Sequence, residues 1–429
     1  HILIDVADHI ENYNAAEWRE DAIHSIQNLL GRANQEGQEV VDTTSGVSSD
    51  RRAKIQEYIQ QSRIDKGYGG SDEAILPVVC GGTMMYLQWL VHGRPDAMRP
   101  TPKAIEMSYK TIQEFQDRDN DYEGAVKHVA SFGKVFAERA QNLTPGDWYR
   151  LRRTLEIALT VEEKRRESES DEGSSDGDKA KEASKIDTLV EQLYSGQRQG
   201  SLASLGFDVR CFFLCPDDRM SHTRVVDKRC EQMLMKGLLK ETTELSLLGR
   251  MPEMAERAIG YRQTLDYLNR EIEQDEKDQE DKSATRVAEE EAFGFYLNEF
   301  TTATRRYAKK QMAWFRKDKE FMFIPVSLKL DKSDRVDSVA NAINRLCKLS
   351  RTDYESELFG GDEYTSGKIK RDNEAQGKTM KFYKPERHIL TSGSKEYDDV
   401  LTEAIKCRRS VRSNNDKKRR REDPSSPPS

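Results

Sequence analysis

The stretch Thr304–Lys317 concentrates basic side chains at spacings that suit binding to a run of phosphate groups. It contains no Pro or Gly and is made of good helix formers, so it predicts a helix. At helical spacing Arg306, Lys310 and Lys317 share one side. Beside them lie Arg305, Lys309 and Arg316, and a separate apolar stripe holds Phe300, Ala303, Tyr307 and Trp314. A solvated face is the usual fate of a charge run, but here a chain of formal net charge -7 has segregated its cations. We therefore interpret the stretch as a phosphate-binding helix.

A glycine turn follows the apolar run Ile75–Cys80, which predicts a buried parallel strand. Gly81 and Gly82 would let a ligand approach the backbone, and a helix beginning at Met84 would offer free N–H groups to an anion. The hydroxyl of Thr83 could hold a phosphate oxygen or a base. A tight strand–helix turn with Thr83 as the helix cap is an equally good interpretation.

Three further groups of basic residues are candidates for anion contacts. Arg150 and Arg153 follow Asp147, a predicted helix cap, and repel each other unless RNA phosphate or Glu156 neutralises them. A second candidate is Arg229, whose guanidinium suits a phosphate but could equally pair with Asp227 or Glu231. The third is the turn Gly260, Tyr261, Arg262 and Gln263, which allows a close backbone approach or simply starts a helix.

Composition narrows the class of protein. The 429 residues are 34% charged and 36% hydrophobic, so a sizeable core must coexist with solvated insertions. None of the six cysteines forms a C-x-x-C pair, so neither zinc nor a redox dithiol is indicated, and scattered thiols fit a reducing compartment. No apolar run is long enough to span a bilayer, so we expect no membrane partner. No Gly-x-x-x-x-Gly-Lys-Ser/Thr phosphate loop is present.

The order of elements predicts an α/β chain with a parallel sheet flanked by helices. We expect an α/β core over 1–100, a helical insertion over 101–160 and an acidic disordered insertion over 161–200. The core resumes over 201–330, with strands at 207–215 and 321–328 and a helix at 225–248, and a mostly disordered basic tail fills 331–429. Residues 33–70 read as an insertion or long loop.

Taken in order, these motifs resemble those of the tRNA dimethylallyltransferases, also called tRNA isopentenyltransferases. The matching segments are His1–Asp5, Tyr13–Trp18, Leu76–Leu87, Asp147–Glu156, the helix around Arg229, Ala258–Gln263 and Thr304–Arg316. The resemblance covers roughly residues 1–330 and identifies a eukaryotic-type member. The family's phosphate loop and its general-base Asp would precede His1, so we expect an N-terminally truncated copy.

The resemblance implies a P-loop NTPase-like core that transfers a dimethylallyl group from dimethylallyl diphosphate to N6 of the adenosine just 3′ of a tRNA anticodon. It assigns Thr83 and Arg229 to catalysis, and Thr83 also to the adenosine. The diphosphate is assigned to Gly81, Gly82, Thr83 and Arg229. The implied contacts to the anticodon stem-loop are Arg150, Arg153, Gly260, Tyr261, Arg262, Gln263, Arg305, Arg306, Lys309, Lys310 and Gln311. Mg²⁺ is implied as a cofactor, with its site on the absent phosphate loop, and we expect no zinc because Lys381–Arg421 lacks the paired cysteines of a zinc finger.

Two other functions remain open. An adenylate isopentenyltransferase acting on free nucleotides would not need the surfaces around Arg150 and Lys310, and a non-catalytic RNA-binding relic would have lost its nucleotide site. The sequence carries no signal of oligomeric state, so a monomer is the default expectation. We expect the cytoplasm or a mitochondrion as its location, or the nucleus if Lys417–Arg421 acts as a localisation signal rather than as an RNA-binding arm or a solubilising end.

Overall fold

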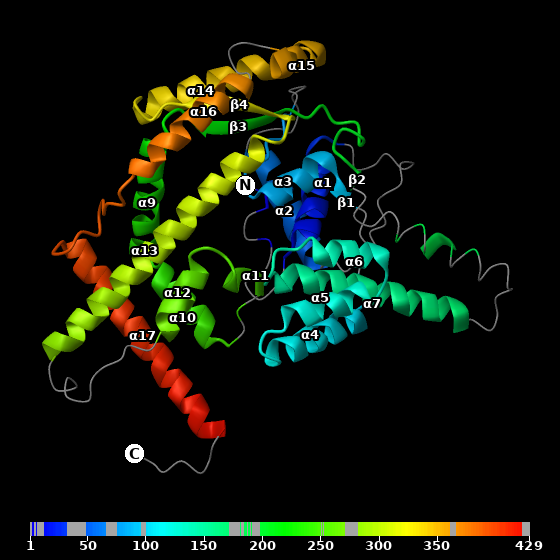
Figure 1. Ribbon diagram of the computed structural model, residues 1–429. Coiled ribbons are helices and arrows are strands. Elements are labelled where there is room, and N and C mark those ends of the chain that lie inside the picture. The colour runs from blue at the N-terminus through cyan, green and yellow to red at the C-terminus, as the bar shows by residue number, and fades with distance from the viewer. Residues whose placement is uncertain are drawn as a thin grey trace. The chain divides into compact units, whose positions relative to one another are not determined.

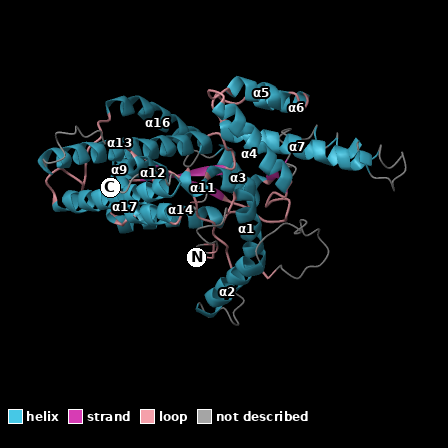
Figure 2. Ribbon diagram, turned by 90° about the horizontal axis from the view of Figure 1, so that it is seen from below, coloured by secondary structure: helices cyan, strands magenta, loops and turns pink. Residues whose placement is uncertain are grey.

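The computed structural model describes residues 2–3, 6, 13–31, 49–65, 75–95, 100–170, 181, 184–186, 188, 190, 198–249, 251, 253–270, 282–360 and 366–422. The chain divides into two compact units, one formed by His1–Leu87 with Asp208–Ser429 and the other by Gln88–Phe207. Helices dominate both, and the described strands form two short pairs (Figures 1 and 2). The chain is thus mostly helical α/β with a small parallel sheet.

The unit Gln88–Phe207 is a helical insertion. Its helices are α4 (Pro102–Asp117), α5 (Tyr122–Ala130), α6 (Lys134–Gln141) and α7 (Trp148–Ser170), and the two-residue strands β1 (Arg94–Pro95) and β2 (Arg198–Gln199) pair antiparallel. Its core lies between helix faces at i, i+3 and i+4 spacing, with Leu151 and Leu155 fully buried. The predicted cap is confirmed, since Asp147 Oδ1 accepts a hydrogen bond from the Arg150 N–H at 3.1 Å.

The other unit contains a parallel pair of strands, β3 (Cys211–Pro216) and β4 (Phe321–Val326), in the register Cys211 opposite Phe321. Both strands were predicted. On one side of the pair, Met322 and Ile324 pack against Leu346 and Leu358. On the other, the ring of Phe213 stacks on that of Phe315 at the end of helix α13, with centroids 4.6 Å apart.

The remaining elements of this unit are helices. They are α1 (Ala15–Leu29), α2 (Ser49–Asp65), α3 (Met84–His92), α9 (Arg219–Met235), α10 (Leu238–Leu247), α11 (Glu253–Glu256), α12 (Tyr261–Asn269), α13 (Lys282–Phe315), α14 (Lys332–Cys347), α15 (Arg351–Gly360), α16 (Ser366–Thr379) and α17 (Lys395–Glu422), with a 3₁₀ turn at Met380–Phe382. Asn14 caps α1, because its Oδ1 accepts from the Ala16 and Glu17 N–H groups, and its Nδ2 donates to the Glu17 side chain. The helix predicted over 225–248 is two helices, α9 and α10, separated at Gly237, whose φ of +95° favours glycine.

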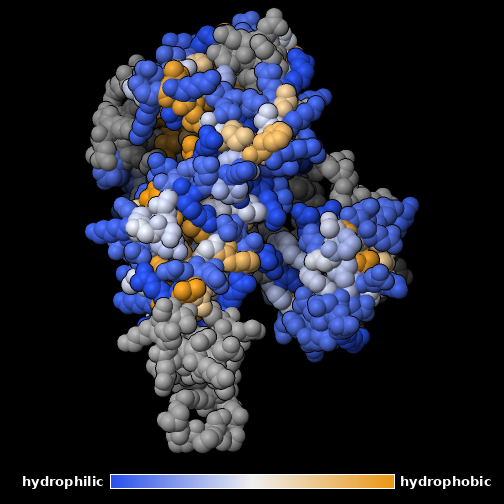
Figure 3. Space-filling model, turned by 60° about the vertical axis from the view of Figure 1, so that its left-hand side comes forward, coloured by the Kyte–Doolittle hydropathy of each residue, from blue (hydrophilic) through white to orange (hydrophobic). Residues whose placement is uncertain are grey.

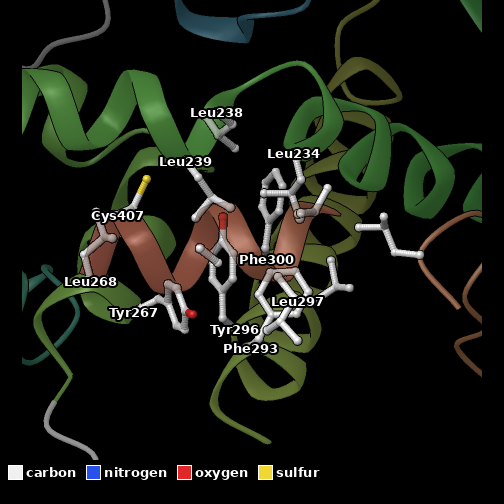
Figure 4. Packing of buried hydrophobic residues seen from close by; sticks show 14 of the residues in the cluster. Leu234, Leu238, Leu239, Tyr267, Leu268, Phe293, Tyr296, Leu297, Phe300 and Cys407 are labelled. Carbon is white, nitrogen blue, oxygen red and sulfur yellow. The ribbon is translucent and has the colours of Figure 1, made fainter. Parts of the chain in front are cut away.

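The main hydrophobic core joins α9, α10, α12, α13 and α17 (Figure 4). Phe293, Tyr296 and Phe300 project from α13 at i, i+3 and i+7, which gives the helix one aromatic side. They meet Leu234 and Leu239 from α9 and α10. This core fixes α13, whose C-terminal part is the predicted phosphate-binding helix. Its exposed cations Arg306, Lys309 and Lys310 are called the basic ridge below.

The C-terminal region differs from the expectation of a mostly disordered tail. Four helices, α14 to α17, fill most of 332–422, and α17 inserts Val400, Leu401, Ala404, Cys407 and Val411 into the main core. These residues recur every three or four positions, so the high Lys and Arg content of the tail concealed a helical apolar stripe. Residues 423–429 lie outside the described part of the chain.

Three more expectations need correction. Residues 75–80 form no strand; the chain there is exposed, with Leu76 at 70% and Val78 at 74%, because no neighbouring strand in the described part covers it. Helix α2 occupies part of the predicted loop 33–70, and the rest of that loop is outside the described residues. Helix α7 continues through the first ten residues of the predicted disordered insertion 161–200, where it still buries Val161.

The described surface is polar. Figure 3 shows one face, which is largely hydrophilic with separate apolar patches. None of the helices in the described ranges combines the length and the apolar content needed to cross a membrane.

Candidate functional site

The glycine turn keeps its backbone and its hydroxyl accessible. Gly81, Gly82 and Thr83 are exposed, and the Thr83 carbonyl accepts hydrogen bonds from the N–H groups of Tyr86 and Leu87 at 3.1 and 3.2 Å, which starts α3. Within the described part of the chain, the Thr83 hydroxyl makes no hydrogen bond. The helix therefore starts on the Thr83 backbone, and the side-chain hydroxyl is left available.

Helix α13 reaches this turn. Gln311 Nε2 donates to the Gly82 carbonyl at 2.6 Å, and the Tyr307 hydroxyl lies 3.5 Å from the same oxygen. The approach is close enough that a Cβ on Gly82 would lie 2.9 Å from Gln311 Nε2. The structure thus brings together two predicted site residues, Gly82 and Gln311, that are 229 positions apart.

An aromatic pair lies beside the turn. Trp18 of α1 stacks on Tyr86 of α3, with ring centroids 5.2 Å apart and planes 14° from parallel. Burial, with a smaller contribution from the charge of Glu17, raises the pKa of Tyr86. Sequence reasoning did not single out this pair, although both rings stand in segments used for the family resemblance.

The predicted basic ridge is largely intact. Arg306, Lys309 and Lys310 are exposed, and none forms an ion pair with another described residue. Helical spacing puts them between the side of α13 that faces Gly82 and the side that carries Arg305. Cations left unpaired on a rigid helix next to the glycine turn can contact successive phosphates.

Arg305, in contrast, is held inside the unit. Its Nη1 lies 2.8 and 2.9 Å from the two carboxylate oxygens of Asp227 on α9, and its Nη2 donates to Thr302 at 2.8 Å. Asp227 is 1% exposed and also accepts from the Tyr383 hydroxyl. These partners give Arg305 a structural role within the unit. The sequence analysis had predicted only a tRNA contact for this residue.

The neighbours of Arg229 resolve the alternatives left open for it. Asp227 pairs with Arg305, and Glu231 accepts hydrogen bonds from three consecutive backbone N–H groups, those of His388, Ile389 and Leu390. Arg229 itself is exposed and makes no ion pair within the described residues. Its guanidinium is accessible to an anion.

The turn at 260–263 does start a helix. Gly260 adopts φ +101° and caps α12, and its N–H donates to Gln263 Oε1 at 2.9 Å in a capping box. The Tyr261 hydroxyl donates to Glu241, and burial followed by this bond raises the pKa of Tyr261 to about 12. Only Arg262 of the four is fully exposed and without an ion pair in the described part of the unit.

In the helical insertion, Arg150 is exposed and Arg153 is half-buried, and both are paired with acids along α7. Arg150 Nη1 lies 3.1 Å from Asp147 Oδ2, and Arg153 pairs with the buried Glu156. The arginine between them, Arg152, is buried and stacks on the ring of Tyr109 at 3.6 Å. The interpretation that acids neutralise these arginines is therefore confirmed, and their contact with RNA phosphate stays a prediction.

Comparison with known proteins decides the family. The model of the IPP transferase family matches residues 50–318, which include every predicted site residue from Gly81 to Gln311. The chain belongs to the IPP transferase family. The match ends before the C-terminal helices α14 to α17 begin.

The individual relatives of this chain carry similar names. It is 33% identical over 271 residues to tRNA dimethylallyltransferase 9 of Arabidopsis thaliana, covering 60% of this chain and 53% of that protein. It is 27% identical over 258 residues to a tRNA dimethylallyltransferase of Protochlamydia amoebophila, covering 60% of each. A solved tRNA delta(2)-isopentenylpyrophosphate transferase of Staphylococcus epidermidis aligns over 80% of both chains with a TM-score of 0.33 and 16% identity. The chain thus spans between about half and three-fifths of the length of these two curated relatives.

The described residues of the chain do not by themselves fit a Mg²⁺ site. They contain no group of three His, Cys, Asp or Glu side chains that could hold a metal ion. Beside the glycine turn, the Thr83 hydroxyl is a hard oxygen ligand, but Mg²⁺ is usually held by carboxylates together with substrate phosphates. The chemistry that these residues can support is anion binding and positioning.

Proposed function

We propose that this protein is a tRNA dimethylallyltransferase, which transfers the dimethylallyl group of dimethylallyl diphosphate to N6 of the adenosine just 3′ of the anticodon. The observation that carries the proposal is the contact of Gln311 with the Gly82 carbonyl. It joins the turn suited to a diphosphate and an adenosine to the helix suited to tRNA phosphates. The family match and the names of the relatives support it.

The proposed reaction gives each available group a task. The N6 lone pair attacks C1 of the dimethylallyl group, the C1–O bond breaks, and pyrophosphate leaves with the bonding electrons. The exposed guanidinium of Arg229 stabilises the growing negative charge on pyrophosphate, and the Thr83 hydroxyl positions the adenosine. Arg306, Lys309 and Lys310 bind phosphates of the anticodon stem-loop.

A finer proposal concerns what the 429 residues do alone. The reaction needs a base for the N6 proton and a cradle of N–H groups for pyrophosphate. In the family pattern both belong to the phosphate loop and the Asp segment, whose motifs do not occur in this sequence. We infer that these 429 residues alone bind tRNA and do not transfer the prenyl group, and that the P-loop-type site, with its Mg²⁺, needs those motifs.

The remaining parts of the proposal concern setting and partners. We infer a monomer that works on cytoplasmic or mitochondrial tRNA. The segment Lys417–Arg421 lies on α17, and its side chains are outside the described part of the chain. Nuclear targeting through this segment stays a prediction.

Two assays test the function. In cells with the gene deleted, isopentenyladenosine in purified tRNA should fall, as measured by mass spectrometry, and should return when the complete gene is restored. In vitro, the complete gene product should label tRNA and not AMP with radioactive dimethylallyl diphosphate, whereas the 429-residue chain should label neither. Labelling of AMP alone would favour an adenylate isopentenyltransferase, and tRNA binding without labelling by the complete product would favour a non-catalytic RNA-binding protein.

A further inference from the structure

Two tyrosines and a buried arginine meet at one edge of the helical insertion. Tyr109 on α4 is 47% exposed, and Tyr149 on α7 is 40% exposed. Between them, the guanidinium carbon of Arg152 lies 3.6 Å from the ring centroid of Tyr109 and 5.7 Å from that of Tyr149. Arg152 is itself 6% exposed. The arrangement exposes aromatic surface over a cation that water hardly reaches.

The contacts around this edge hold it rigid. Arg152 Nε lies 3.8 Å from Glu156 Oε1, one turn along α7. At the start of α4, the Thr101 N–H donates to Thr160 Oγ1 of α7 at 3.2 Å. Further along α4, Tyr109 contacts Arg152 of α7, so the two helices run antiparallel and are in contact at two levels. Side chains held in place before binding lose little conformational entropy when a ligand arrives.

Exposed cations lie beside Tyr149. The side chains of Arg150 and Arg153 are 62% and 43% exposed, and helical spacing puts both on the side of Tyr149 away from Arg152. Their acidic partners, Asp147 and Glu156, are mostly covered, at 24% and 2% side-chain exposure. The face presented to solvent is therefore aromatic and cationic.

We propose that Tyr109 and Tyr149 form a stacking platform for an unpaired base of an RNA loop, with Arg150 and Arg153 contacting phosphates next to that base. Aromatic rings interleaved with arginines are how proteins hold unstacked bases, because every base has a π face. A base within a duplex keeps both faces stacked and cannot use the platform. This proposal rests on the tRNA-binding function proposed above. It adds which part of the RNA the helical insertion binds, namely an unpaired base of a loop.

The test measures binding of two RNAs of equal charge, a stem-loop and a blunt duplex, to the 429-residue chain. Tyr149→Ala and Tyr109→Leu should each weaken stem-loop binding by about 5- to 150-fold, the loss expected for one stacked base. Duplex binding and the salt dependence of stem-loop binding should stay unchanged, since no charge is removed. Tyr149→Phe and Tyr109→Phe, which keep the rings, should bind as the original protein does.

Controls separate stacking from folding. Met107→Ala removes a side chain of similar exposure, 46%, on the opposite flank of α4 and should leave stem-loop binding unchanged. A 2-aminopurine in the loop should lose fluorescence on binding and regain it with Tyr149→Ala. Stem-loop binding equal to that of the original protein in both Tyr149→Ala and Tyr109→Leu would overturn the platform and leave the tRNA function standing. No preference for the stem-loop over the duplex would also overturn it, while the isopentenyladenosine assay judges the function independently.

Discussion

Asp227 and Arg305 form an ion pair between α9 and α13, with both carboxylate oxygens within 2.9 Å of one guanidinium nitrogen. Tyr383 adds its hydroxyl to the same carboxylate, and this contact, together with burial of the ring, raises the pKa of Tyr383. The pair fixes the helix that carries Arg229 against the helix that carries the basic ridge. Neighbouring arginines on α13 thus have different tasks, since Arg305 points inward and Arg306 points to solvent.

This difference predicts opposite effects of two adjacent substitutions. Arg305→Ala leaves the Asp227 charge buried without its cation, so it should lower the free energy of unfolding by about 3 kcal/mol. Arg306→Ala should change it by less than about 0.5 kcal/mol but should weaken tRNA binding. Urea unfolding and filter binding on both variants measure the two effects. Equal stability of the two variants would refute the structural role of Arg305.

A second prediction concerns Glu231, which holds the segment before α17. Its carboxylate is 0% exposed and accepts from three successive backbone N–H groups at 388–390. Glu231→Gln removes the charge and one acceptor, so it should cost about 1.5–3 kcal/mol of stability. Amide exchange at residues 388–390 should quicken. Gln232→Ala, on the exposed side of the same helix, is the matched control and should leave that exchange as it is.

A third prediction concerns pH. Burial, and then the nearby charge of Arg219, lowers the pKa of His222 from its ordinary value of 6.5. In the unfolded chain His222 takes up its proton near the ordinary pKa, whereas in the folded protein it does so only at lower pH. Its contribution to stability is therefore present above the ordinary pKa and is lost as the pH falls through it toward the folded pKa. The free energy of unfolding of His222→Gln should fall less steeply between pH about 7.5 and about 5.5 than that of the original protein. Parallel curves would show that His222 is not the titrating group.

Local rules explain what the sequence could reveal of the fold. The cap at Asp147 and the strands β3 and β4 depend on neighbouring residues or on short apolar runs, and the structure confirms them. The disorder predicted for the tail was wrong, because average composition outweighed a periodic stripe in α17. The strand predicted over 75–80 was wrong for another reason. An apolar run shows that a segment can be buried, but not that a partner strand is there to cover it.

The candidate site depends even more than the fold on tertiary contacts, which a local sequence pattern does not display. The type and exposure of Lys309 and Lys310 follow from helical spacing, which a sequence displays. The pairing of Arg305 with Asp227, 78 positions away, and the approach of Gln311 to Gly82 depend on tertiary contacts that no local pattern contains. The platform of Tyr109 and Tyr149 was missed because its rings come from two helices that only tertiary packing brings together, although Tyr149 lies in the matching segment Asp147–Glu156.

The last prediction tests the basic ridge itself. Lys309 and Lys310 are exposed on a helix whose other side is anchored in the main core, so replacing them should leave the fold unchanged. If each neutralises one phosphate, Lys309→Ala with Lys310→Ala should reduce the slope of log Kd against log salt by about 1.4–1.8, at roughly 0.7–0.9 per contact. The loss should affect all tRNAs equally, because phosphates carry no sequence information. Lys329→Ala with Lys332→Ala removes two exposed cations at the far end of β4 and serves as the control of equal charge, since net charge alone would weaken binding in both variants. An unchanged slope in a folded Lys309→Ala, Lys310→Ala protein, or an equal change in the control, would show that the ridge is an ordinary solvated face.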